Sequence, residues 1–345
     1  MNLWTLRPDP STALRPGACP RPERSTELTP KSRAEGSGLT LSGASLRGYL
    51  KGGRRTILQA NLECAPCILK WVYERAGILA TEKGRFQLVR RISQILASEF
   101  HRGTNVGALS NRMTDSISEY LSSSANYYRD IKRRNNQRVR QLLPSAKKYI
   151  EKGRTPQERF KRACRLASAS NVAPMTVPVE AFRFQEAINI LKGKNPFPVL
   201  IGDVFGAARR ATRILYLTDN AGEVGFDSLL IATLREMDAT VNLVVKKDPF
   251  FEDATIQDAL SFSIDKLVDD IFTVNGFFIP GNSTSLLSDI FKKSDLVIAK
   301  GTGNYEALKG KLRGKRVIYL LKVKCNPIST DIGAPVGTFV VKVEK

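Results

Sequence analysis

The chain of 345 residues contains a single histidine, His101. One imidazole cannot supply a histidine-rich zinc site, and it leaves at most one base for serine–histidine or cysteine–histidine catalysis. His101 lies within residues 98–103, a stretch typical of a helix end, where an imidazole is usually a solvated cap partner. A catalytic metal in this protein would therefore have to be bound by oxygen or by sulfur.

The sequence also lacks an apolar run long enough to cross a membrane, so we expect no membrane partner. Its five cysteines are an odd number in a chain without a secretory signal, which favours a cytoplasmic location. Hydrophobic residues make up 42% of the chain, enough for a real core in one large domain or two smaller ones. The oligomeric state stays open at this stage.

Residues 1–58 are rich in proline, glycine, serine and arginine and show no sustained hydrophobic period. They lack the apolar core of a secretory signal, and their prolines would interrupt an amphipathic transit helix. We expect either a disordered extension or upstream sequence translated from a misplaced start codon. The segment is left out of the predicted fold.

The rest of the chain changes pattern once. From about residue 61 to 190 apolar residues recur at three- and four-residue spacing, which predicts helices. Helices are expected, among others, over residues 126–150, 156–169 and 179–191. After that, short β-branched apolar runs alternate with helical or loop segments, as in a parallel sheet. These predicted strands cover residues 214–217, 241–245, 270–274, 296–299 and 317–321, and residues 338–343 predict an additional strand at an edge.

The predicted fold class is therefore α/β. We expect a helical subdomain over residues 59–195, packed on a mostly parallel, Rossmann-like α/β/α sheet over residues 196–345. The second subdomain would bind the metal and carry out the chemistry.

The segment with the most chemical information follows the predicted strand over residues 214–217. Asp219 and Asn220 come at its carboxyl end, before the small-residue turn Ala221-Gly222 and a helical pattern. Open α/β sheets bind ligands at this end of their strands. A carboxylate next to a carboxamide suits a hard cation such as Mg²⁺ or Mn²⁺. A turn that caps the next helix would explain the same pair equally well.

Two further strand ends supply polar groups. Asp253 follows the strand over residues 241–245 and offers a second carboxylate, although on its own a helix cap is the better explanation. The strand over residues 296–299 ends in Lys300, followed by Gly301 and Gly303. The ammonium of Lys300 could contact a phosphate oxygen, and the glycines let the backbone approach a ligand.

Two carboxylates, one carboxamide and one lysine at strand ends suggest metal-assisted hydrolysis of a phosphate ester. A divalent cation would polarise the ester and lower the pKa of a bound water, and Lys300 would balance developing charge. This chemistry needs no histidine, in agreement with the composition. A phosphorylated small molecule is the expected partner.

The motifs closely resemble those of the damage-control phosphatases, a family long catalogued as a domain of unknown function. The matching segments are residues 219–223 with Phe226 and Asp227, residues 252–255, residues 300–306, and residues 128–132 through Asn136. Cys64 and Cys67 look like the Cys-x-x-Cys start of the archaeal and bacterial-type branch. The resemblance spans about residue 60 to the C-terminus.

The resemblance implies a metal-dependent phosphatase that acts on sugar phosphates or related damaged metabolites, with Mn²⁺, Mg²⁺, Co²⁺ or Ni²⁺ as cofactor. Asp219, Asn220 and Asp253 would bind the metal, and Lys300 would contact the phosphate. The remaining substrate-facing positions implied by the resemblance are Gly301, Gly303, Asn304, Asn171, Glu223 and Asp227. Asn171 is followed here by Val172, where the family usually has an acidic residue.

The cysteine pair Cys64 and Cys67 allows half a zinc site, a redox pair or two core thiols. No second Cys-x-x-Cys exists in the sequence, so only Cys325 or Cys164 could join the pair. We favour a structural cluster with Cys325, because Lys324-Cys325 also matches the family.

The net charge of +21 and the basic stretch over residues 129–140 raise the alternative of a nucleic-acid-binding protein. We favour a solvated basic helix face there, with Ile131, Val139 and Leu142 turned inward. A carboxyl methyltransferase, an activity proposed within the family, ranks lower because Ala221-Gly222 is too short for an S-adenosylmethionine fingerprint.

Overall fold

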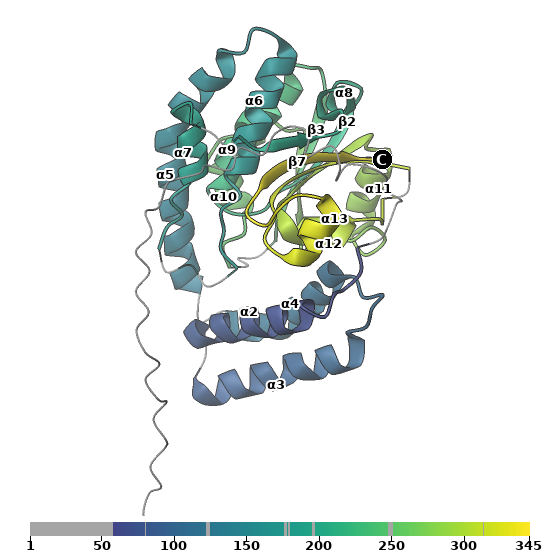
Figure 1. Ribbon diagram of the computed structural model, residues 1–345. Coiled ribbons are helices and arrows are strands. Elements are labelled where there is room, and N and C mark those ends of the chain that lie inside the picture. Colours follow the sequence, from purple (N-terminus) through teal and green to yellow (C-terminus); the bar gives the residue numbers. More distant parts are fainter. Residues whose placement is uncertain are drawn as a thin grey trace, which may run out of the picture. The chain divides into compact units, whose positions relative to one another are not determined.

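The computed structural model describes residues 58–345 apart from residues 80, 122–124, 176–177, 179, 195–196, 248–250 and 313. All described residues belong to one compact unit, Tyr49–Lys345 (Figure 1). The predicted extension over residues 1–58 lies, except for its last residue, outside the described residues. The helices and strands of the compact unit have the following bounds. Its helices are α2 (Cys64–Leu79), α3 (Glu82–Glu99), α4 (Val106–Leu121), α5 (Ala125–Glu151), α6 (Pro156–Ala169), α7 (Gln185–Leu191), α8 (Val204–Arg209), α9 (Glu223–Arg235), α10 (Ile256–Leu260), α11 (Ser285–Lys293), α12 (Gly301–Leu308) and α13 (Asn326–Ile332), with a short 3₁₀ helix at Ile264–Lys266.

The strands form one seven-stranded sheet in the order β1-β7-β6-β5-β2-β3-β4. Their bounds are β1 (Val199–Ile201), β2 (Arg213–Leu217), β3 (Thr240–Lys246), β4 (Asp270–Val274), β5 (Leu296–Lys300), β6 (Arg316–Lys322) and β7 (Phe339–Glu344). The five neighbouring strands β4, β3, β2, β5 and β6 are parallel to one another. Strand β7 runs antiparallel to β6 and parallel to β1. The α/β fold with a mostly parallel sheet is thus confirmed.

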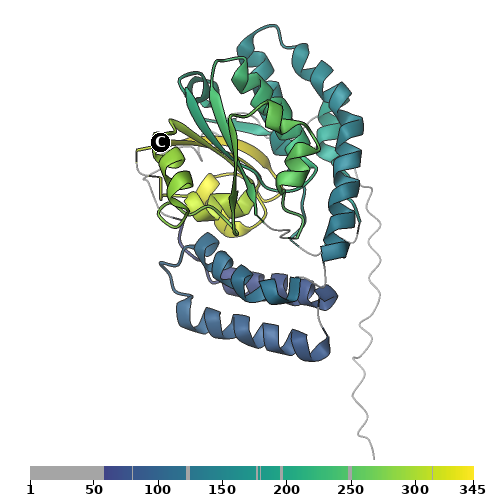
Figure 2. The same cartoon turned by 180° about the vertical axis from the view of Figure 1, so that it is seen from behind.

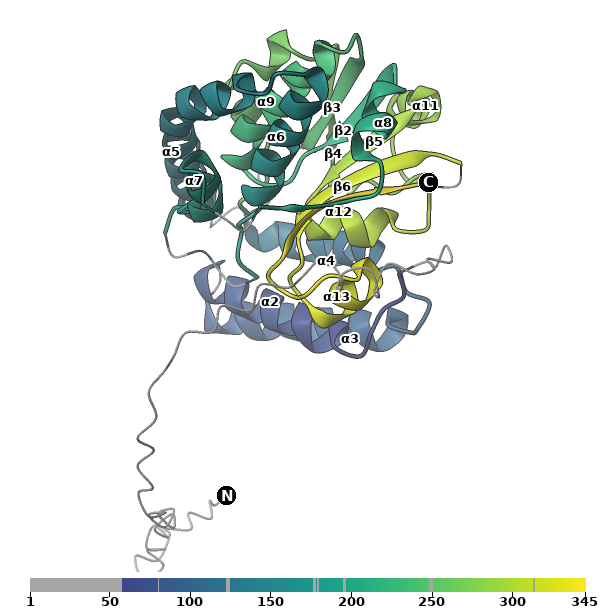
Figure 3. The same ribbon diagram turned by 45° about the horizontal axis from the view of Figure 1, so that its top comes forward.

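Alternate residues of the central strands enter two separate cores. Ile214 and Tyr216 of β2 pack with α5, α6 and α9 on one face, and Leu215 and Leu217 pack with α12 and α13 on the other. Because successive side chains of a strand point to opposite faces, a strand buried on both faces reads as a continuous apolar run. Figure 3 shows the sheet between these two groups of helices.

The helices α2, α3 and α4 form a third cluster beside the sheet, which the views from front and back both show (Figures 1 and 2). Their own core includes Val72, Leu88, Ile92 and Met113. The cluster is fixed to the sheet layer through α4 and α12, because Gly107 lies directly against Ala307. These three helices cover the carboxyl end of the sheet, where the candidate site lies.

Two predicted elements differ from the structure. Residues 338–343 were expected at an edge, but β7 lies inside the sheet because the three-residue strand β1 pairs with its outer side. A strand of three residues gives too short a pattern to detect. The helix expected over residues 179–191 begins only at Gln185, after Phe184 in a left-handed backbone conformation. Residue 179 lies outside the described residues.

The helices α5, α6 and α7 share a core with the sheet, although all three lie within residues 59–195. The proposed boundary between residues 195 and 196 stays a prediction. Among the described residues, no helix combines the length and the apolar character that a membrane crossing requires.

A substitution at Gly107 tests the contact between α4 and α12. A Cβ at this position would lie 2.5 Å from the Ala307 Cβ. We expect Gly107→Val to lower the free energy of unfolding by about 1–3 kcal/mol through overpacking, measured by urea denaturation. Ser116→Val, at a half-buried site on the same helix, controls for the helix propensity of valine. Equal stability of the two variants would mean that the two helices separate without cost.

Candidate active site

The site lies at the switch point of the sheet, where the strands that follow β2 and β5 are added on opposite sides. Strands β2 and β5 are paired at the centre of the sheet, and β3 and β4 follow on one side while β6 follows on the other. A crevice at the carboxyl ends of such strands is the usual ligand site of an open α/β sheet. Asp219 follows β2 and Gly301 follows β5, so both belong to this crevice.

The loops after β2 and β3 are hydrogen-bonded to each other. Ala221 N–H donates to the Glu252 carbonyl and Ala254 N–H donates to the Asp219 carbonyl, both at 2.8 Å. This places Asn220 opposite Asp253 in an isolated antiparallel bridge. Two backbone hydrogen bonds therefore bring together the three residues expected to bind a metal.

None of these three residues caps a helix through its side chain. The N-cap of α9 is Gly222, and that of α10 is Thr255, whose N–H donates to Asp258 Oδ2 at 2.8 Å. The capping explanation that the sequence left open thus does not account for Asp219, Asn220 or Asp253. Their side chains instead line a pocket of about 290 Å³ at the carboxyl end of the sheet.

The turn after Asn220 needs glycine. Gly222 has a φ of +81°, and a Cβ there would lie 2.9 Å from the Phe184 ring and 3.0 Å from the Asn135 Cβ. Its N–H donates to Asn136 Oδ1 of α5 at 2.7 Å. The helix α5 thus supports the loop that carries Asp219 and Asn220.

The basic residues of α5 are partly engaged inside the protein. Lys132 is buried and forms an ion pair with Asp258 at 2.7 Å, and Arg140 donates to the Ser261 carbonyl. Arg133, exposed like its neighbour Arg134, pairs with Asp130. The buried side chains of this helix thus support the loops of the site. The alternative of nucleic-acid binding stays a prediction.

Two carboxamides organise the carboxylates. Asn171 is fully buried, and its Nδ2 donates to Asp219 Oδ2 at 2.7 Å and to both Glu223 oxygens at 3.1 Å. Asn220 Nδ2 donates to the same Asp219 oxygen at 2.9 Å and to Glu223 at 2.8 Å. The structure therefore places Asn171 in the site although Val172 departs from the family pattern.

Lys300 is completely buried, and its ammonium lies 2.9 Å from Asp227 and 3.3 Å from Glu223. Burial by itself would lower the pKa of this lysine, but the two carboxylates outweigh burial and raise it. Burial raises the pKa of Glu223 to about 8, although Lys300 and the two carboxamides oppose it. Lys300 does not line the pocket in this conformation but neutralises charge beneath its floor.

The residues after Lys300 have distinct positions. Gly301 has a φ of +80°, and a Cβ there would lie 2.1 Å from Asp219 Oδ2, so the backbone of α12 begins in contact with that carboxylate. Gly303 lines the pocket against the Phe277 ring. Asn304 is buried and donates to the Thr218 and Lys300 carbonyls, which indicates a structural role.

Asp253 has one cationic neighbour, Lys246, whose ammonium lies 3.3 Å from its Oδ2. Burial raises the pKa of Asp253 to about 7, partly opposed by Lys246 and reinforced by Asp219 and Glu252. Oδ2 accepts no well-aligned hydrogen bond from the described residues. Such an oxygen is available to a cation.

The charges of the site fit a divalent cation. Among the described residues at this end of the sheet, the buried carboxyl groups are Asp219, Glu223, Asp227, Glu252 and Asp253, and the buried cations are Arg75, Lys246 and Lys300. Two carboxylates are thus left without a buried cation, and burying unpaired charge is costly. No three described His, Cys, Asp or Glu side chains gather as a metal site, and the oxygen of the Asn220 amide lies beside the carboxylates of Asp219 and Asp253.

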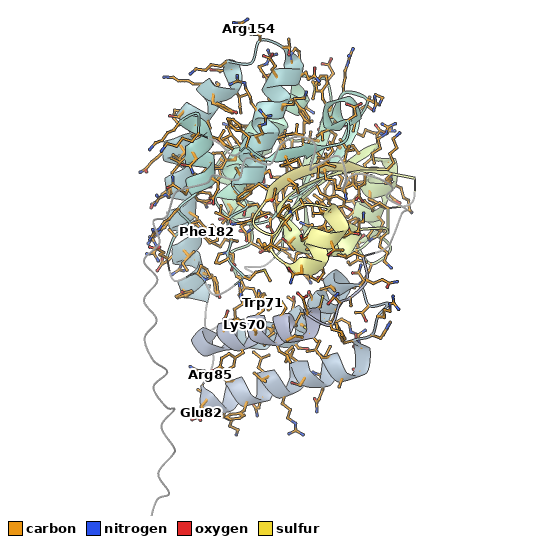
Figure 4. All side chains as sticks on the ribbon, viewed as in Figure 1. Lys70, Trp71, Glu82, Arg85, Arg154 and Phe182 are labelled. Atoms are coloured by element: carbon orange, nitrogen blue, oxygen red, sulfur yellow. The ribbon has the colours of Figure 1, made fainter. Side chains whose placement is uncertain are left out.

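The helix α2 contacts the loop after β3, which carries Asp253, through Arg75. This buried side chain donates to Glu252 Oε1 at 3.0 Å, and its guanidinium stacks 4.4 Å from the centroid of the Trp71 ring, labelled in Figure 4. Phe251, in a left-handed conformation (φ +50°), contacts the same ring edge-on. No sequence pattern points to Arg75, because an arginine in a helix usually faces solvent.

The opposite wall of the pocket carries Lys324, Glu306 and the three cysteines Cys64, Cys67 and Cys325. The thiols are free, and burial raises the pKa of each. The predicted association of Cys325 with the Cys-x-x-Cys pair agrees with this placement, whereas its structural role stays a prediction. Lys324 is half-buried, and its ammonium has no hydrogen bond or ion pair with the described residues.

Residues 60–340 match the family described as "Damage-control phosphatase ARMT1-like domain". A damage-control phosphatase of Archaeoglobus fulgidus is 33% identical over 287 residues, which cover 81% of this chain and 97% of the relative. The damage-control phosphatase PH1575 of Pyrococcus horikoshii is 35% identical over 190 residues, or 52% of this chain and 64% of that protein.

A crystal structure of PH1575, described there as a DUF89 family protein, superposes with a TM-score of 0.69. The match has 23% identity and covers 83% of this chain and 99% of the other, which supports the fold alone. An uncharacterised protein of Methanocaldococcus jannaschii is 29% identical over 288 residues, which cover 80% of this chain and 92% of that protein.

We expect Arg75→Ala to lower the free energy of unfolding by about 3–5 kcal/mol, because it leaves Glu252 charged and unpaired in the interior. Replacing both partners, by Arg75→Ala with Glu252→Gln, should recover part of this loss. Urea denaturation of the two single variants and the double variant measures the coupling. Strictly additive effects would argue against the buried ion pair.

A pH dependence follows for the metal-free protein. The pKa values of Glu223 and Asp253 rise from ordinary values of 4.5 and 3.8 to about 8 and about 7 on folding. The folded state then binds more protons than the unfolded state between these limits, so stability falls as the pH rises. We expect the metal-free protein to melt at a lower temperature at about pH 8 than at about pH 5.

The variant Asp253→Asn removes one of the two groups and should show a smaller drop in melting temperature over the same interval. Asp238→Asn, in an exposed left-handed turn that asparagine also tolerates, is the matched control. An unchanged drop in Asp253→Asn would exclude Asp253 as a source of the pH dependence.

Proposed function

The chain belongs to the damage-control phosphatase ARMT1-like family, and on this premise we propose that it hydrolyses phosphate monoesters of small metabolites with the help of a divalent cation. Sugar phosphates and related damaged metabolites are the proposed substrates. The observation that carries the proposal is the pairing of Asn220 with Asp253 beside Asp219, since it forms an oxygen-rich group at the pocket floor.

Asp219, Asn220 and Asp253 are the proposed ligands for Mn²⁺, Mg²⁺, Co²⁺ or Ni²⁺. When bound, such a cation polarises the phosphoryl group and lowers the pKa of a coordinated water. Asn171 orients the Asp219 carboxylate through its 2.7 Å hydrogen bond, and Asn220 uses its amide nitrogen for the same purpose. The Oδ1 atom of Asn220 then stays available for the cation.

The phosphate group needs a cation that can reach it. Lys300, the residue first proposed for this contact, would have to leave its ion pairs with Glu223 and Asp227. Lys324 lines the pocket and has no ion pair with the described residues, so we assign the phosphate contact to Lys324. Lys300 then keeps Glu223 and Asp227 neutralised, which limits the negative charge that a phosphate would meet.

The test is phosphate release from a panel of sugar phosphates and from 4-nitrophenyl phosphate. Metal-stripped protein should be inactive, and turnover should appear when Mn²⁺, Mg²⁺, Co²⁺ or Ni²⁺ is added singly. We expect Asp219→Asn to lose about 100-fold or more in kcat/KM, because a neutral ligand replaces a charged one.

Asp238→Asn is again the matched control and should keep full turnover, since its side chain is exposed and remote from the pocket. Absence of phosphate release from every substrate with every metal would refute the proposed function. Full activity of Asp219→Asn would refute the proposed ligand set.

A further inference from the structure

One carboxyl group that lines the pocket has no hydrogen-bond or ion-pair partner among the described residues. The pocket-lining carboxyl groups with a described hydrogen-bond or ion-pair partner are Asp219 with Asn171, Glu252 with Arg75, Asp253 with Lys246 and Glu63 with Asn326. Glu306 is the exception, since its side chain has no such partner among the described residues. It is half-buried, and its oxygens are not sealed off from the pocket.

The helix α12 directs Glu306 toward the same space as the proposed metal ligands. Thr302, Gly303 and Glu306 all line the pocket, and Gly301 at the start of the helix touches Asp219. Glu306 lies five positions after Gly301, a rise of about 7.5 Å along a helix. This distance suits a group that acts on the far side of a phosphate held near Asp219.

The surroundings of Glu306 favour a carboxyl group that keeps its proton near neutral pH. Burial raises its pKa to about 7, opposed by the nearby Lys324. The other titratable neighbours are Cys64 and Cys67 of α2 and Cys325 before α13, whose raised pKa values keep the thiols neutral. On the α4 side, the Asn105 amide donates to the backbone carbonyls of Glu306 and Ala307.

We propose that Glu306 is the general acid that protonates the leaving oxygen of the substrate, an inference that rests on the proposed phosphatase function. The bond between phosphorus and the ester oxygen breaks, and its electron pair stays on that oxygen. The Glu306 O–H gives its proton to this oxygen, so that a neutral alcohol leaves. A water oxygen forms the new bond to phosphorus and releases one of its protons to solvent, and the Glu306 carboxylate regains a proton from solvent.

The experiment compares two leaving groups. An alkyl phosphate such as glycerol phosphate needs a proton on its departing oxygen, whereas 4-nitrophenolate leaves readily without one. We expect Glu306→Gln to lower kcat/KM for glycerol phosphate by about 100-fold and for 4-nitrophenyl phosphate only slightly. Glu236→Gln, an exposed glutamate that pairs with Arg159, is the matched control and should change neither value.

The pH profile of the unaltered protein gives a second measurement that does not depend on how the variant folds. A general acid must be protonated, so kcat for glycerol phosphate should fall as the pH rises above about 7, and kcat for 4-nitrophenyl phosphate should not share this fall. In Glu306→Gln this alkaline fall should be absent.

Equal losses on both substrates in a Glu306→Gln protein with unchanged melting temperature would overturn the inference. Identical pH profiles for the two substrates in the unaltered protein would overturn it as well. In both cases the unaltered protein still releases phosphate, so the proposed function stands. No release from either substrate would instead refute the proposed function itself.

Discussion

The excess of buried negative charge at the carboxyl end of the sheet is the constraint on which the site depends. Among the described residues, and apart from the Lys132–Asp258 pair, five buried carboxyl groups share this region with three buried cations, and a low-dielectric interior makes every unpaired charge expensive. Ion pairs with Lys300, Lys246 and Arg75 and hydrogen bonds from carboxamides stabilise these carboxylates. A divalent cation bound by these carboxylates would remove the remaining imbalance, and its binding would then stabilise the fold.

This charge cluster also ties the helices α2–α4 to the chemistry. Arg75 is held between the Trp71 and Phe251 rings and pairs with Glu252, the residue before Asp253. Phe251 itself belongs to the core of the α2–α4 cluster. The loop that carries a proposed metal ligand is thus fixed by side chains more than 170 positions away in the sequence. The cluster forms one wall of the pocket and also positions part of its floor.

Lys300, which the sequence suggested for the phosphate, and the pocket-lining Lys324 have different environments. Lys300 is buried beneath the floor, whereas Lys324 stands on the wall beside Glu306. A lysine at a strand end has the same sequence pattern in either case, because the pattern fixes the position of its Cα but not the direction of its side chain. The lysine that neutralises buried carboxylates and the lysine that lines the pocket are separate groups in this fold.

The sequence by itself determined the α/β class, the central strands and the family. It did so because buried parallel strands are continuous apolar runs, and because the strand-end motifs around Asp219, Asp253 and Lys300 are local in the chain. The interior position of β7 required its pairing with β1, a strand too short to show a pattern. Only the tertiary structure placed Arg75 against Glu252, separated Lys300 from Lys324 and left Glu306 without a partner among the described residues. Such contacts join distant segments, and their energies depend on burial, which no local pattern encodes.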